Sequence, residues 1–164
     1  MPKADISLQL VTQEKARNRV RIHQNPDRTL PRSKILRGKL NFQRLFERSS
    51  VIKQSPLLCR YRIDSNIDSR SMFGFIAPKK VFRRAVDRNR TKRLLREAFR
   101  LNQHLLPESV RNNKIGFHAV FIATGNNLSF SDTEKRMISI LNEISRRLTS
   151  GSTSESDNNP QKTD

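Results

Sequence analysis

The chain has 164 residues, of which 33 are lysine or arginine and 15 are aspartate or glutamate, so its formal net charge is +18. Only 34% of the residues are hydrophobic, against about 45–50% in an average domain, and no apolar run is long enough to span a membrane. This length fits one modest domain with tails, and the charge favours a polyanion as partner. With Cys59 as the single cysteine and no signal-peptide core at the N-terminus, we expect a protein of the reducing cytoplasm.

Both ends of the chain are polar. Residues 1–31 carry three prolines and no sustained hydrophobic period, which predicts a disordered basic N-terminal arm. Residues 150–164 are rich in serine, aspartate and asparagine, which predicts a disordered tail. Residues 32–149 are then expected to form the folded domain.

The first part of this domain changes from a helical to an extended pattern. The segment NFQRLF, residues 41–46, places apolar side chains at i, i+3 and i+4, which predicts a short amphipathic helix with Asn41 as its N-cap. Residues 51–52 predict a small edge strand. In the next segment, PLLCRYRI, apolar and polar residues alternate, which predicts a strand. One face would carry Leu57, Cys59, Tyr61 and Ile63, and the other Leu58, Arg60 and Arg62.

SMFGFIAPKKV predicts a second buried strand that ends near Pro78. The basic stretch RNRTKRLLREAFR then predicts a helix that has Asp87 as its N-cap and ends at about His104. On a helical wheel, one side of this helix is apolar: Thr91, Leu94, Leu95, Ala98 and Leu101. The opposite side holds Asn89, Lys92, Arg93, Arg96 and Arg100, with Arg88 and Arg90 on its flanks. Residues 79–100 hold ten basic side chains against two acids, and like charges at i, i+4 destabilise a helix. This arrangement predicts that a polyanion neutralises the row.

The last elements are a strand and a helix. FHAVFIAT, residues 117–124, predicts a buried strand between two glycines. Ser131 and Glu134 then form a predicted capping box. It is followed by an apolar stripe of Met137, Ile140, Leu141, Ile144 and Leu148. The expected fold is α+β: a single domain with a roughly four-stranded sheet and three helices, in the order α-β-β-β-α-β-α.

RNA is favoured over DNA as the polyanion. A strand precedes the basic helix where a helix-turn-helix protein would have another helix, and three aromatic residues could stack unpaired bases. These are Phe42, Phe46 and Tyr61. Core packing remains the alternative for all three, and it is favoured for Tyr61, whose face also carries Leu57 and Ile63.

AVDRNRTKRLLREAFR, residues 85–100, resembles the RNR segment of the bacterial ribonuclease P protein subunit. LNFQRLF, FGFIAPKK and FHAVFIAT resemble, in order, its first helix, the strand with its Lys-Lys ending and its last strand, so that the resemblance covers about residues 34–148. It implies a left-handed crossover through the RNR helix and a protein that assists a catalytic RNA. That RNA, with Mg²⁺ bound mainly by RNA and substrate, removes the 5′ leader of precursor tRNA.

The resemblance also implies roles for single residues. Contacts to the catalytic RNA are expected from Lys79, Lys80, Arg88, Asn89, Arg90, Lys92, Arg93, Arg96 and Arg100. A cleft for the single-stranded leader is expected to be lined by Phe42, Phe46, Arg60 and Tyr61. Two departures stand out. Phe82 occupies a position where the family often has glycine, and Arg83-Arg84 make that loop longer and more basic. The alternation also turns Arg60 outward and Tyr61 inward, so which of them faces the leader stays open.

No catalytic or metal site of the protein's own is predicted, because the three histidines are scattered and the glycines form no phosphate loop. A structural RNA-binding protein of the ribosomal type is the second hypothesis. A basic helix docked on a membrane is the third, and it is disfavoured because the apolar side of the helix is continuous with a core.

Overall fold

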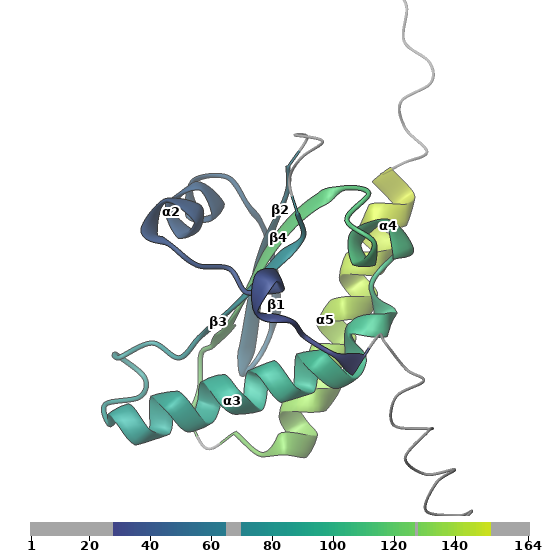
Figure 1. Ribbon diagram of the computed structural model, residues 1–164. Coiled ribbons are helices and arrows are strands. Elements are labelled where there is room, and N and C mark those ends of the chain that lie inside the picture. Colours follow the sequence, from purple (N-terminus) through teal and green to yellow (C-terminus); the bar gives the residue numbers. More distant parts are fainter. Residues whose placement is uncertain (1–27, 65–69, 127, 152–164) are drawn as a thin grey trace, which may run out of the picture.

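A computed structural model describes residues 28–64, 70–126 and 128–151. Four strands form one mixed sheet with helices on both of its faces (Figure 1). The elements are, in order, η2 (Arg32–Lys34), α2 (Lys39–Glu47), β1 (Ser50–Gln54), β2 (Leu57–Asp64), β3 (Met72–Ile76), α3 (Ala85–Asn102), η3 (Gln103–Leu105), α4 (Glu108–Arg111), β4 (Gly116–Ala123) and α5 (Phe130–Gly151). The predicted order is confirmed; η2, η3 and α4 are additions that the sequence pattern did not predict.

The strand order in the sheet is β1-β2-β4-β3. β1 is an edge strand, as predicted, and pairs antiparallel with β2, which in turn pairs antiparallel with β4. β3 and β4 are parallel, so the chain must cross over between them, and α3 lies in this connection. The hand of the crossover stays an expectation from the resemblance.

The main core lies between the sheet and the helices α3 and α5. Leu57, Cys59 and Tyr61 of β2 are buried there as the alternation predicts, and burial raises the pKa of the Cys59 thiol. Ile63, the last residue predicted on this face, is 52% exposed and not part of the core. It lies beside Leu148 in the last turns of α5, where the apolar stripe ends and leaves the end of β2 uncovered.

Among the described residues, the opposite face of the sheet is covered by α2 and the segment before it. Leu45 is fully buried there in a small cluster with Leu36 and Val120. Gly74 of β3 permits close approach of α2, because a Cβ at that position would lie 3.2 Å from Cε1 of Phe42.

Helices α2 and α3 begin earlier in the sequence than predicted. Asn41 is not the N-cap of α2: the helix follows Gly38, whose φ of +83° suits glycine, and the Asn41 amide donates to the Arg37 carbonyl at 2.7 Å. Asp87 is not the N-cap of α3 either, because the helix begins at Ala85 and Asp87 lies in its first turn. Both helices begin at least two residues earlier than the expected caps.

The N-terminus of α5 has a different capping pair from the predicted Ser131 and Glu134. The Ser129 hydroxyl accepts from the Asp132 amide at 3.1 Å and donates to the Asp132 carboxylate at 2.6 Å. Glu134 instead accepts from the side chain of Asn102 at 3.1 Å, which joins α5 to α3.

The domain limits differ slightly from the expected 32–149. The carbonyls of Arg28 and Thr29 accept hydrogen bonds from Arg100 and Gln103, so the domain begins before residue 32. Helix α5 continues through Gly151. Residues 1–27 and 152–164, on which most of the predicted disorder falls, lie outside the described residues.

Candidate nucleic-acid interface

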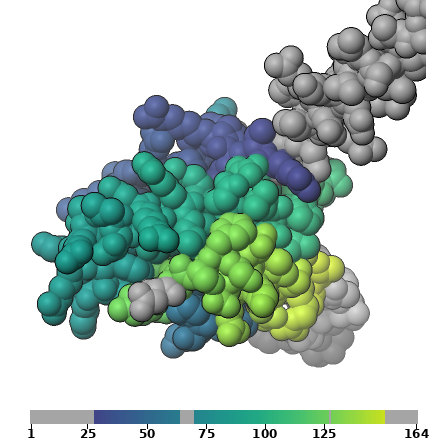
Figure 2. Space-filling model, turned by 90° about the horizontal axis from the view of Figure 1, so that it is seen from below, coloured from purple at the N-terminus to yellow at the C-terminus, as the bar shows by residue number. Residues whose placement is uncertain are grey.

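The orientation of α3 is set by its apolar side. Leu95, Ala98 and Phe99 are fully buried against the sheet and α5, and Thr91 is 6% exposed. Because these residues recur at helical spacing, they determine which side of α3 faces the solvent. The outer side of α3 forms a broad part of the surface in Figure 2.

Most of the predicted RNA contacts lie on this outer side or in the turn before the helix. Lys79, Lys80, Asn89, Arg90, Arg93 and Arg96 are exposed, and Lys92 is half-buried. We call the six cations among these seven residues the basic surface. Within the described ranges, none of the six forms a salt bridge with an acid. Arg96 has one further contact, because its guanidinium carbon lies 6.0 Å from the centre of the Phe75 ring. The self-repulsion inferred from the sequence is thus present in the folded chain.

Arg88 has a different position from the rest of the row. It is half-buried, and its Nη1 donates to the carbonyls of Phe82 at 3.1 Å and Arg83 at 2.7 Å. Its guanidinium therefore attaches the loop before α3 to the first turn of the helix. This position fits the flank of the row, where the helical wheel places Arg88.

Arg100 is held by an acid of the same helix. Its guanidinium donates to both carboxylate oxygens of Glu97, at 2.6 and 2.9 Å, and to the Arg28 carbonyl at 2.7 Å. Hydrogen bonding to Arg100 lowers the pKa of Glu97, and the same bonds raise the pKa of Arg100. Arg100 is thus the one cation of the predicted row that, within the described residues, forms a salt bridge.

We expect Glu97→Gln to strengthen binding of the chain to a structured RNA about two- to fourfold at 0.15 M salt, because it frees up to one guanidinium for a phosphate. Because the pKa of Glu97 is lowered from its ordinary value of 4.5, the carboxylate is ionised at any pH above 4.5. The ion pair with Arg100 is lost only as the pH falls through the lowered pKa. The gain should be equal at pH 6 and pH 8 in a filter-binding titration. Glu47→Gln, which removes the same charge from α2, serves as the control, and an equal gain there would mean that only net charge matters.

A second candidate surface lies between α2 and β2. The guanidinium carbon of Arg60 is 5.4 Å from the centre of the Phe46 ring, and Arg60 donates to the Phe46 carbonyl at 3.4 Å. Arg62 donates to the Arg44 carbonyl at 3.3 Å. Both carbonyls lie at the C-terminal end of α2, where the Arg44 carbonyl also accepts from the Arg48 amide at 3.5 Å, so the two strand arginines attach the end of the helix to the sheet. Phe42, Phe46, Arg60 and Arg62 together form what we call the α2–β2 surface.

The four members contribute unequally. Phe46 is 41% exposed, whereas Phe42 is half-buried and packs against Gly74 and the cluster around Leu45. Of the two alternatives for these aromatic residues, core packing therefore applies to Phe42, whereas the exposed ring of Phe46 is available for base stacking. Arg62 was not among the predicted contacts, although the alternation already placed it on the face of Arg60.

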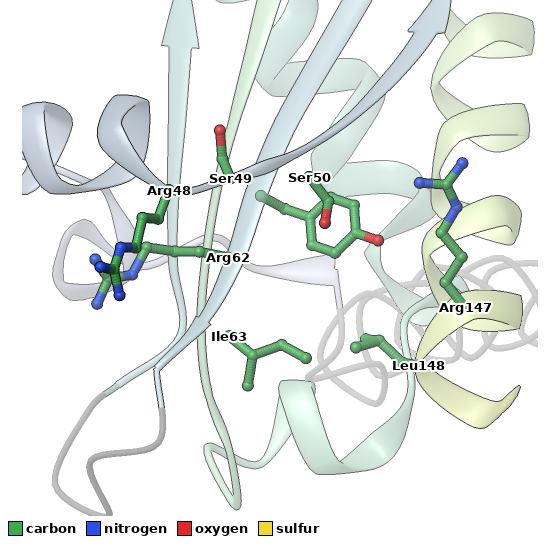
Figure 3. A pocket seen from close by; sticks show the side chains of 8 residues that line it. Arg48, Ser49, Ser50, Arg62, Ile63, Arg147 and Leu148 are labelled. Atoms are coloured by element: carbon green, nitrogen blue, oxygen red, sulfur yellow. The ribbon is translucent and has the colours of Figure 1, made fainter. Parts of the chain in front are cut away.

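Tyr61 does not belong to this surface. It is 5% exposed on the opposite face of the sheet, and its ring stacks on Phe117 with 5.5 Å between the centres. It borders a cavity of about 300 Å³ whose other side is α5, where Figure 3 shows Arg147 and Leu148. Hydrogen bonds to Glu143 and Tyr61 raise the pKa of Arg147. The resemblance implied Tyr61 as a cleft residue, whereas the structure places it in the core, the alternative that the sequence favoured, because the strand alternation holds without a register slip.

A family model described as Ribonuclease P matches residues 30–145, which is more than half of the chain. The chain belongs to the ribonuclease P protein family. It is 37% identical to the ribonuclease P protein component of Chlorobaculum tepidum over 57% of this chain and 64% of that protein, slightly less than two thirds of its length. It is 38% identical to the ribonuclease P protein component of Porphyromonas gingivalis over 62% of this chain and 74% of the relative.

Solved structures of the ribonuclease P family share the fold. The RNase P protein from Thermotoga maritima is similar with a TM-score of 0.54 and 23% identity, over 67% of this chain and 96% of that chain. The protein from Staphylococcus aureus is similar with a TM-score of 0.51 and 17% identity, over 71% and 94%. The family predicted from the RNR segment is confirmed, and so is the α+β fold.

Two further findings concern metal ions and membranes. The residues that the structure describes hold no group of three or more His, Cys, Asp or Glu side chains able to share a metal ion. Among the same residues, no helix is long and apolar enough to cross a membrane.

Proposed function

We propose that this member of the family is the protein component of ribonuclease P and binds the catalytic RNA through the basic surface of α3. The proposal is carried by the basic surface, whose six cations form no salt bridge within the described residues and whose direction is fixed by the buried side of α3. Arginine suits this role because its planar fork donates two hydrogen bonds to a phosphate. The alternative of a structural ribosomal-type protein has no observation of its own in its favour.

The contribution of the protein to cleavage would be electrostatic. A catalytic RNA and a precursor tRNA are both polyanions, and their association requires neutralisation of phosphates. Cations held on a folded helix supply part of that neutralisation, while Mg²⁺ would be held by the RNA and the substrate. We further propose that hydrolysis belongs to the RNA and that the protein works in the cytoplasm, where its single cysteine stays reduced.

We also propose that the α2–β2 surface contacts the unpaired 5′ leader. The exposed Phe46 ring can stack a base, and Arg60 and Arg62 lie beside it to meet the backbone. Arg60 already covers part of the Phe46 ring, so a stacked base would share that ring with the guanidinium. This surface and the basic surface lie on different sides of the sheet, so one protein could hold two RNA segments at once.

The function is tested by cleavage of a leader-bearing precursor tRNA by a bacterial catalytic RNA at low Mg²⁺, with and without the purified chain. Stimulation is expected, and cleavage at the rate of the RNA alone would leave only a structural role. In the same assay, Phe46→Ala should raise KM for a long-leader substrate about tenfold through the loss of base stacking, and should leave the KM of a leaderless substrate unchanged.

The matched control is Leu40→Ala. Leu40 is also a large exposed apolar residue of α2, at 67% exposure, but it points about 120° away from Phe46 around the helix axis. An equal rise in KM for both variants, or for both substrates, would show that α2 does not bind the leader.

A further inference from the structure

A groove of about 710 Å³ lies between the first turns of α3 and the connection from β4 to α5. Its floor includes Phe82 and Thr91, each 6% exposed, with the half-buried side chains of Leu94 and Leu128. Its rim carries exposed polar and charged side chains: Arg83, Arg84, Asp87, Arg90 and Asn126. We call this the α3 groove. Its volume is that of a small-molecule site, and an apolar floor with a few polar groups suits a planar ring.

One wall of the groove is formed by the loop between β3 and α3, which contributes Val81, Phe82, Arg83 and Arg84. The amides of Val81 and Phe82 donate to the Pro78 carbonyl at 3.0 and 2.9 Å. The Phe82 side chain is buried, and Arg88 donates to the Phe82 and Arg83 carbonyls. These contacts hold the loop in place, so the groove is already shaped in the free protein.

Asp87 is unusual among the residues of the rim. It is exposed, it is not the N-cap, and no lysine or arginine of the described ranges forms a salt bridge with it. A carboxylate among arginines that meet phosphates weakens RNA binding unless it accepts a hydrogen bond from the RNA. The bases offer such donors, and guanine offers two side by side on its pairing edge, the N1–H and the N2 amino group.

We propose that the α3 groove takes one unpaired guanine of the catalytic RNA, with its base on the apolar floor and its pairing edge on the Asp87 carboxylate. The arginines of the rim then hold the flanking phosphates. This rests on the proposed function, because it assumes that α3 docks on that RNA. The leader is not the occupant, since the α2–β2 surface lies on the other face of the sheet.

The decisive measurement is the affinity of the full chain for the catalytic RNA when Asp87 is replaced by asparagine. Asp87→Asn turns one acceptor into a donor, so binding should weaken about tenfold, the size of one lost base-edge contact. A groove that held only phosphates would give the opposite sign, because removal of a negative charge strengthens binding. Glu108→Gln removes the same charge from α4 and should not weaken binding.

Probing of unpaired guanines with kethoxal identifies the nucleotide. One guanine should be protected by the wild-type chain and by Glu108→Gln, and exposed with Asp87→Asn. Replacing that guanine with adenine should weaken wild-type binding and leave binding of Asp87→Asn unchanged. Equal or tighter binding of Asp87→Asn, or the same protection pattern as for wild type, overturns the groove proposal. A wild-type chain that does not bind the catalytic RNA overturns the proposed function itself.

Discussion

Phe99→Ala is expected to lower the free energy of unfolding by about 3–5 kcal/mol, because it leaves a cavity at the centre of the core. The Phe99 side chain is fully buried. Its ring centre lies 4.5 Å from that of Phe73, 5.3 Å from Phe121 and 5.7 Å from Phe75. The other rings belong to the sheet, so the mutation removes the contact that joins α3 to both β3 and β4. A domain of this size has about 5–15 kcal/mol of stability in total.

Urea denaturation followed by circular dichroism measures this loss. Val86→Ala is the matched control, since Val86 lies on the same helix but is 75% exposed, and it should change stability by less than about 0.5 kcal/mol. Equal losses in the two variants would contradict the packing of α3. The remaining folded fraction of Phe99→Ala should still bind RNA with the wild-type salt dependence, because the side chain has no part in the basic surface.

The double variant Arg93→Ala, Arg96→Ala is expected to weaken binding to the catalytic RNA about 20-fold at 0.15 M salt. If each guanidinium neutralises one phosphate, the slope of log affinity against log salt should decrease in magnitude by about 1.4–1.8. The fold should survive, because both side chains are exposed and the contact of Arg96 with Phe75 is worth only about 0.5–1 kcal/mol. Titrations at several salt concentrations and a thermal melt give both quantities.

The control for net charge is Lys135→Ala, Arg136→Ala, which removes two exposed charges from α5. A contact interface predicts a smaller change in slope for this variant, since these two residues lie outside the basic surface. An equal decrease in the salt slope of both double variants would show that RNA binding depends on total charge and would contradict a specific contact of the RNA with α3.

Local periodicity was enough to predict the directions of side chains on single elements. The 3.6-residue period of α3 separates Leu95 and Ala98 from Arg93 and Arg96, and the period of two in β2 separates Tyr61 from Arg60. Both separations hold in the structure. The family could also be predicted at this level, because the RNR segment is a continuous stretch of sequence.

Helix starts were less predictable, because several polar residues near a helix start can each act as a cap. Asn41, Asp87 and Ser131 are all suitable cap residues by type, yet α2 follows Gly38, α3 begins at Ala85 and α5 is capped by Ser129. The backbone path into each helix selects among them, and that path depends on how the preceding segment packs against the sheet.

The sequence by itself determined the family, the alternation of β2 and the outward direction of the basic row, because each is encoded by residues a few positions apart. Only the tertiary structure decided that Arg88 and Arg100 are engaged within the protein, that Tyr61 lies on the opposite face from Phe46, and that the loop at Phe82 meets the segment near Leu128 in one groove. The physical reason is that these contacts join residues whose proximity depends on sheet pairing and helix packing, and no local repeat in a sequence carries that information.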